Sequence, residues 1–141
     1  MDSASDLNKR KVQLFVEAVW NEGRLELIDE LVADDYVGRL PLLERRVRGR
    51  EGVRWLVSCG RRALPDLYVK IEDQIAEDDR VATRWRVTAG RTPCYAGISI
   101  IRLLAGKQVD SETAYSVLTA VSERSAVPEP GHQLPTFHQI R

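Results

Sequence analysis

Histidine and cysteine, two residue types that often carry catalysis or hold metals, are scarce in this chain. Of its 141 residues, two are histidine and two are cysteine. The cysteines, Cys59 and Cys94, lack the spacing of a metal site, and we favour buried free thiols in a reducing cytosol over a disulfide. The histidines, His132 and His138, are too few to hold a metal by themselves. The sequence therefore predicts no metal centre.

Net charge and long hydrophobic runs are absent as well. Basic and acidic residues cancel at 21 each, so no basic field attracts nucleic acid or anionic lipid. No apolar run approaches the roughly 20 residues needed to span a bilayer. The polar N-terminus has no signal-peptide pattern, and no glycine-rich phosphate loop or nucleotide fingerprint occurs. We expect a cytoplasmic protein that needs no cofactor and binds neither nucleic acid nor membrane.

The length and composition fit one domain with a tail. Hydrophobic residues make up 43% of the chain, enough to fill one core. We place this domain at residues 1–122. The remaining stretch, 123–141, has three prolines and no periodicity, which predicts a flexible tail or an arm that wraps a partner in a dimer.

Helical spacing dominates the first half of the chain, and strand alternation dominates the second. We expect helices near 7–20, 25–32 and 51–62, with Leu7 and Leu14 on the apolar face of the first. The stretch 33–48 is expected to be an irregular strand or loop. Four later segments predict an antiparallel meander, and 98–104 is apolar enough to be a central strand buried on both faces. The order predicts an α+β fold. The expected strands are 67–72, 81–88, 98–104 and 108–120.

Several short motifs occur in an order that is typical of one family. They are FVEAVWNEG at 15–23, ADDYV at 33–37, GREGV at 49–53, LPDL at 64–67, IAEDDRVA at 75–82 and GISIIR at 97–102. Through their order and spacing the chain resembles the SnoaL-like polyketide cyclases of the NTF2-like superfamily. The resemblance implies a cone of N-terminal helices packed on a curved antiparallel sheet around an apolar pocket, usually in a homodimer. It also implies chemistry on small, oxygenated, polyketide-like molecules.

The proton-transfer residues of the name-giving cyclases are missing. In those enzymes a carboxylate on the last strand acts as general acid and base, and this position falls on Thr113. A histidine on the preceding strand falls on Ser99, and an asparagine falls on Gly38. Threonine cannot take up a proton at neutral pH, so the cyclase mechanism is not carried over, although Thr113 and Ser99 remain candidate catalytic positions.

A different strand register would bring an acid into the pocket. A slip of one residue reverses every side chain of a strand, and Asp110 or Glu112 would then replace Thr113 inside. The alternation of Val109, Ser111 and Thr113 against the two acids favours the opposite, with both acids on the outer face near arginines. Glu112 is kept as a catalytic candidate for the slipped register.

Arginines and aromatic residues supply the candidate substrate-binding groups. Two positions that often hold histidine in the family are Arg39 and Arg91, which could bind a carboxylate or enolate oxygen, or could simply be solvated. Tyr36 and Tyr115 could contact a substrate oxygen, and Trp55 could edge the pocket; core packing is the alternative for each.

Two functions are compatible with these observations. The first is a cofactor-independent enzyme of natural-product biosynthesis that performs cyclisation, isomerisation or a related proton transfer in an apolar pocket. The second is a non-catalytic small-molecule-binding or dimerisation module whose acid/base residues have been lost. The inward orientation of a carboxylate would favour the first function.

Overall fold

The structure, a computed structural model, describes residues 2–41 and 46–118. The predicted tail 123–141, with both histidines, lies outside the described residues, as does the end of the predicted domain. No helix in the described ranges is long and apolar enough to cross a membrane.

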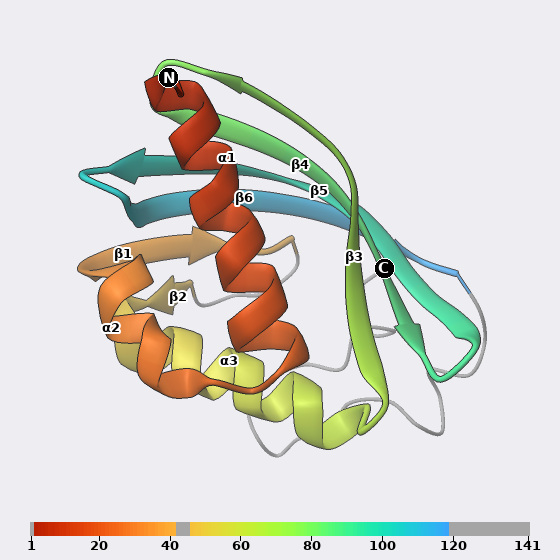
Figure 1. Cartoon of the computed structure of the whole chain (residues 1–141). Coiled ribbons are helices and arrows are strands. Elements are labelled where there is room, and N and C mark those ends of the chain that lie inside the picture. The colour runs from red at the N-terminus through yellow and green to blue at the C-terminus, as the bar shows by residue number, and fades with distance from the viewer. Residues whose placement is uncertain (1, 42–45, 119–141) are drawn as a thin grey trace.

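Three helical regions form where the spacing predicts them (Figure 1). The first begins with a capping box, in which Ser3 and Asp6 satisfy each other's backbone amides. The elements are α1 (Ala4–Leu14), the π-helical η1 (Phe15–Asn21), the 3-10 helix η2 (Leu25–Leu27), α2 (Ile28–Leu31) and α3 (Gly49–Ala63).

The buried face of the first helical region differs from the prediction. Val12 and Val16 are buried, whereas Leu7 and Leu14 are 50% and 45% exposed. The prediction assumed a regular period of 3.6 residues, but α1 continues into a π-helical segment. A π-helix adds residues to each turn and so rotates the face that meets the sheet.

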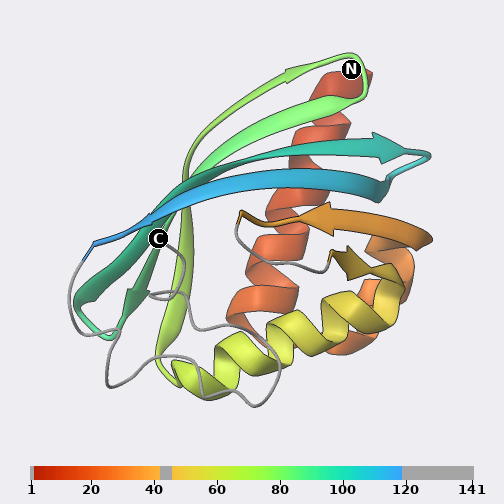
Figure 2. The same cartoon turned by 180° about the vertical axis from the view of Figure 1, so that it is seen from behind.

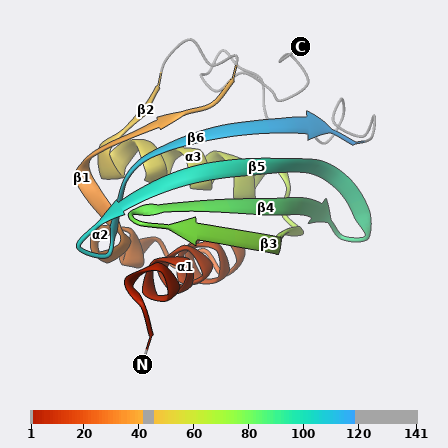
Figure 3. The same ribbon diagram turned by 90° about the horizontal axis from the view of Figure 1, so that it is seen from above.

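Six strands form one mixed sheet in the order β2-β1-β6-β5-β4-β3 (Figure 3). The predicted antiparallel meander is confirmed by strands β3 to β6. The stretch 33–48 contributes β1 and β2, and β1 pairs with β6 in parallel. The strands are β1 (Val32–Arg39), β2 (Val47–Arg48), β3 (Leu67–Glu77), β4 (Arg80–Ala89), β5 (Thr92–Leu104) and β6 (Lys107–Val117).

The helices lie on the concave side of this curved sheet. Seen from behind, β4, β5 and β6 pass in front of α1 (Figure 2). Buried apolar side chains form one cluster between helices α2 and α3 and strand β1, represented by Ile28 and Val57, which are both fully buried. Two further clusters lie under α1 and η1, around Val81 and Val87. The core is thus distributed around the inside of the cone.

The central strand is not buried on both faces as predicted. Ile98 and Ile100 of β5 are 48% and 49% exposed, whereas Ile101 is buried. No described helix covers the outer face here (Figure 2), so an apolar sequence on β5 leaves one row of side chains at the surface. Arginines and acids surround this row, and Arg102 bonds Asp110 at 3.1 Å.

Both cysteines are free and buried, as favoured from the sequence. Burial raises the pKa of the Cys59 and Cys94 thiols, so little thiolate forms at neutral pH. We predict that 5,5′-dithiobis(2-nitrobenzoate) modifies neither thiol in the native protein and modifies both in urea. Absorbance of the released thiolate measures this. Rapid modification of the native protein would contradict the burial.

Candidate functional site

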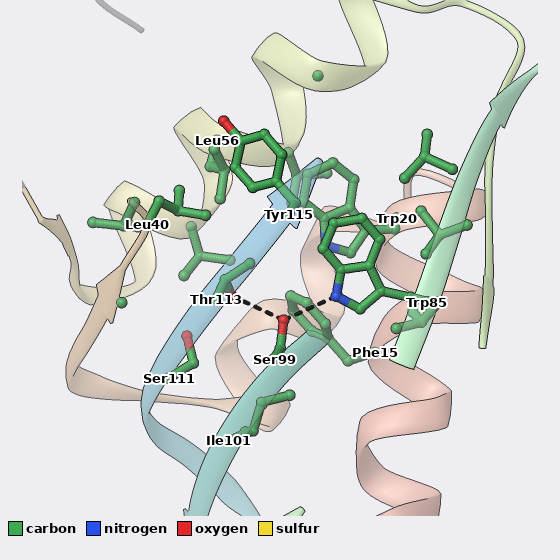
Figure 4. Close-up of a pocket in the computed structure, with 18 of the residues that line it drawn as sticks. Phe15, Trp20, Leu40, Leu56, Trp85, Ser99, Ile101, Ser111, Thr113 and Tyr115 are labelled. Atoms are coloured by element: carbon green, nitrogen blue, oxygen red, sulfur yellow. Dashed lines mark hydrogen bonds between the residues drawn. The ribbon is translucent and has the colours of Figure 1, made fainter. Parts of the chain in front are cut away.

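A cavity of about 180 Å³ lies between the helices and the concave face of the sheet. Its wall is largely apolar (Figure 4). Phe15 and Trp20 project from η1, Leu56 from α3, and Ile101 from β5. Such a wall favours a molecule with a substantial apolar surface.

The polar groups of the cavity lie mainly on the sheet, and three of them form a row across it. Thr83 on β4 pairs with Ser99 on β5, which pairs with Thr113 on β6. Trp85 Nε1 donates to Ser99 Oγ at 3.0 Å, and Ser99 Oγ lies 2.8 Å from Thr113 Oγ1 (Figure 4).

This arrangement leaves one hydrogen available. Trp85, Ser99 and Thr113 together carry three donor hydrogens, but only two hydrogen bonds join them. Whichever hydroxyl donates to the other, one hydroxyl hydrogen has no acceptor among the described residues. The row can therefore donate a hydrogen bond to an oxygen atom of a bound molecule.

Gly97 allows the Trp85 indole to reach this row. A Cβ at residue 97 would lie 2.5 Å from Trp85 Cζ2 and 2.5 Å from the Ala114 carbonyl oxygen. Only glycine therefore lets the indole lie across β5 while the strand keeps its pairing with β6.

A second aromatic residue uses glycine in the same way. The Tyr36 hydroxyl and Ser111 Oγ share a hydrogen bond of 2.7 Å, and a Cβ at residue 38 would lie 2.6 Å from that hydroxyl. Burial raises the pKa of Tyr36, although its bond to Ser111 acts in the opposite direction. Tyr36 is therefore a neutral hydroxyl, and this pair also has one more hydrogen than its single bond uses.

Two more tyrosines form one end of the pocket. Tyr95 and Tyr115 meet edge to face, with ring centroids 6.0 Å apart. Burial raises the pKa of both phenols, so both stay protonated at neutral pH.

Most of the candidate residues named from the sequence line this cavity, and three do not. Glu112 is exposed, Arg91 is exposed in the turn between β4 and β5, and Trp55 packs beside Cys59 on α3 instead of lining the pocket. Arg39 is exposed overall but contributes to the lining. The candidates that line the cavity are Tyr36, Arg39, Ser99, Thr113 and Tyr115.

The acids of β6 lie outside because the register of the strand places its hydroxyls inside. Ser111 and Thr113 line the cavity, so the alternating Asp110 and Glu112 face outward. Asp110 is bound there to Arg102. Glu112 lies on the outer face of the sheet for the same reason and does not reach the pocket.

The alternation fails at one point of the same strand. The pairing of β6 with β5 shifts between Arg102 and Leu103, and Gln108 lies opposite Leu103. As a result Gln108 lines the cavity in place of Val109, which the alternation predicts to face inward. A β-bulge depends on backbone pairing, and nothing in the sequence predicted this one.

Two other lining residues, Trp85 and Ser111, were not named as site residues from the sequence. The signal that could have found Trp85 is Gly97, which makes room for its ring. Ser111 shares the inward alternation of Thr113. The described residues contain no cluster of histidine, cysteine and acids that could hold a metal.

Comparison with known proteins is consistent with this geometry. The family model of the SnoaL-like polyketide cyclases matches residues 10–114, and the chain belongs to this family. A comparison with curated proteins gave no match.

Solved structures share the fold at low sequence identity. IdmH of Streptomyces antibioticus, a proposed polyketide cyclase, is 26% identical at a TM-score of 0.66, over 77% of this chain and 91% of its own. A proposed SnoaL-like polyketide cyclase from Jannaschia sp. CCS1 is 18% identical at a TM-score of 0.74, over 91% of this chain and 98% of its own. A proposed polyketide cyclase from Acidithiobacillus ferrooxidans is 22% identical at a TM-score of 0.70, over 81% of this chain and 91% of its own.

The contact between Tyr36 and Gly38 can be tested by mutation. Gly38→Ala places a methyl group against the Tyr36 hydroxyl and should displace it from Ser111, at a cost of about 1–3 kcal/mol in the free energy of unfolding. Urea denaturation measures the loss. In a Tyr36→Phe background, which lacks the crowded oxygen, the same substitution should cost clearly less. Equal costs in both backgrounds would show that the hydroxyl is not the obstacle.

Proposed function

We propose that this protein binds a neutral, carbonyl-bearing, polyketide-like molecule and promotes a cyclisation, isomerisation or related proton-transfer step without a cofactor. The observation that carries the proposal is the available hydroxyl hydrogen of Ser99 and Thr113, at the position where the family's acid is expected. The apolar wall of the cavity would hold the carbon skeleton.

The chemistry follows from what these groups can and cannot do. Removing a proton from the carbon beside a carbonyl places negative charge on the carbonyl oxygen. A hydroxyl that already points to this oxygen stabilises the charge, and more strongly in an apolar cavity than in water. Since no described lining residue is a carboxylate or an imidazole, the proton would pass to water at the pocket.

Arg39 would contribute at the rim of the same pocket. It is the only arginine among the described lining residues, so a second oxygen of the ligand near the rim could accept from its guanidinium. Arg91 does not line the cavity, so only Arg39 of the two candidate arginines is proposed to contact the ligand.

A non-catalytic pocket is the second candidate. It is favoured by the absence of a carboxylate or imidazole from the described lining, because general-base catalysis normally accounts for much of an enolisation rate. Under this alternative the same donors select a carbonyl-bearing ligand but cause no turnover. Natural-product biosynthesis in the cytoplasm remains the proposed setting for both.

The hydroxyl row of Ser99 and Thr113 is tested as a hydrogen-bond donor with 2-acetylnaphthalene, an apolar aromatic ketone. Ser99→Ala combined with Thr113→Val removes both hydroxyls, because in Thr113→Val alone the Ser99 hydroxyl would still have a free hydrogen. We expect binding, followed by calorimetry, to weaken about tenfold, or about 1.4 kcal/mol, since one hydrogen bond to the ketone is lost. The control is Thr88→Val, which changes a threonine of β4 that does not line the cavity.

Exchange of the ketone's methyl hydrogens for deuterium separates the two candidate functions. Faster exchange with the wild-type protein than with this double variant would support proton-transfer catalysis, whereas binding without exchange would support the non-catalytic pocket. If the control weakens binding as much as the double variant, or if naphthalene-2-carboxylate binds more tightly than the ketone, the proposal of a neutral carbonyl ligand fails.

We also propose a homodimer that covers the exposed apolar row of β5. Ile98 and Ile100 are half exposed on the outer face of the sheet, and a second copy would remove them from water.

Ile100→Lys should therefore convert a dimer to a monomer, because it places a charge from each copy in the apolar contact. Sedimentation equilibrium measures the mass. Leu7→Lys is the matched control, since Leu7 is 50% exposed on α1, which lies on the other side of the sheet from this row. A monomeric wild-type protein would refute the dimer, and dissociation by both variants would refute this interface.

A further inference from the structure

Gln108 is a buried polar side chain without a hydrogen-bond partner. It is 4% exposed, and its Nε2 makes no hydrogen bond among the described residues. It also lines the cavity. A primary amide has two donor hydrogens and one acceptor oxygen, and a buried amide is normally satisfied.

The backbone of β6 is irregular where Gln108 turns inward. The pairing with β5 shifts between Arg102 and Leu103, and the pairing with β1 shifts between Val32 and Val37. Regular alternation from Thr113 would bring Val109 into the cavity and turn Gln108 outward. The bulge thus replaces an apolar side chain by an amide, which is unfavourable for packing alone.

Gln108 lies well apart from the hydroxyl row. Ser99 and Leu103, the β5 partners of Thr113 and Gln108, are separated by four residues, or about 13 Å of strand. The Tyr36–Ser111 pair lies between the two, and the wall around it is apolar. The cavity therefore has hydrogen-bond donors at three places along one sheet face, and Gln108 and the hydroxyls of Ser99 and Thr113 are the two outer ones.

We propose that Gln108 binds a second oxygen of the ligand through its amide N–H, at the end of the cavity away from Ser99 and Thr113. The ligand is then an elongated molecule with an oxygen acceptor near each end. This inference rests on the proposed function, since it assumes a carbonyl oxygen at the hydroxyl row. It adds a residue that selects ligands by the position of a second acceptor.

The test compares 2,6-diacetylnaphthalene, which has a ketone at each end, with 2-acetylnaphthalene, which has one. Wild-type protein should bind the diketone about tenfold more tightly. Gln108→Leu removes the amide and keeps an apolar side chain of similar size, and should abolish this preference while the affinity for the monoketone stays the same. Calorimetry measures all four affinities.

Thermal unfolding separates a ligand-binding role from a structural one. Gln108→Leu should unfold at the same or a higher temperature, because it removes an unsatisfied amide. Gln74→Leu is the matched control: Gln74 lies outside the cavity and bonds Gln13, the Lys9 carbonyl oxygen and Thr83, so its loss should lower the unfolding temperature and leave the diketone preference intact.

Each other outcome overturns the assignment in a recognisable way. If wild-type protein binds the monoketone but does not prefer the diketone, or if Gln108→Leu keeps the preference, the Gln108 contact is refuted and the pocket stands. The same conclusion follows if Gln108→Leu lowers the unfolding temperature without changing the preference, as a water-bonded structural amide would. If wild-type protein binds neither ketone, the proposed function fails and the Gln108 contact fails with it.

Discussion

The antiparallel pairing of β5 with β6 is the constraint on which the site depends. It places Ser99 opposite Thr113, and both hydroxyls face the cavity. The same pairing turns Asp110 outward to Arg102. A strand offers its side chains alternately to two faces, so one register decides at once that hydroxyls are inside and carboxylates outside. This register therefore keeps the carboxylates of β6 out of the pocket.

Two glycines make the polar groups of the cavity reachable. Gly97 leaves room for the Trp85 indole, and Gly38 leaves room for the Tyr36 ring. In each case an apolar ring covers the backbone of the strand and its polar atom bonds a serine on a neighbouring strand. The aromatic rings therefore shape the wall of the pocket and orient its hydroxyls together.

The cavity offers hydrogen-bond donors, and none of its described lining residues is a carboxylate or an imidazole. Tyr36 and the two tyrosines Tyr95 and Tyr115 stay protonated because burial disfavours the phenolate. Such a site suits an oxygen acceptor better than a carboxylate, except near Arg39 at the rim. A family scaffold can thus keep its cavity while its chemistry changes, because the fold does not fix the site residues.

The sequence alone determined the family, the three helical regions and the meander β3 to β6, since motif order and local periodicity are properties of neighbouring residues. It also named Thr113 and Ser99 as candidate site residues, and both line the cavity. Tertiary structure decided what local patterns cannot encode. The parallel pairing of β1 with β6 joins residues distant in sequence, the π-helical segment rotated the buried face of α1, and the open outer face left Ile98 and Ile100 at the surface. The bulge that turns Gln108 inward arises from the pairing of β6 with both neighbours, so only the folded sheet reveals it.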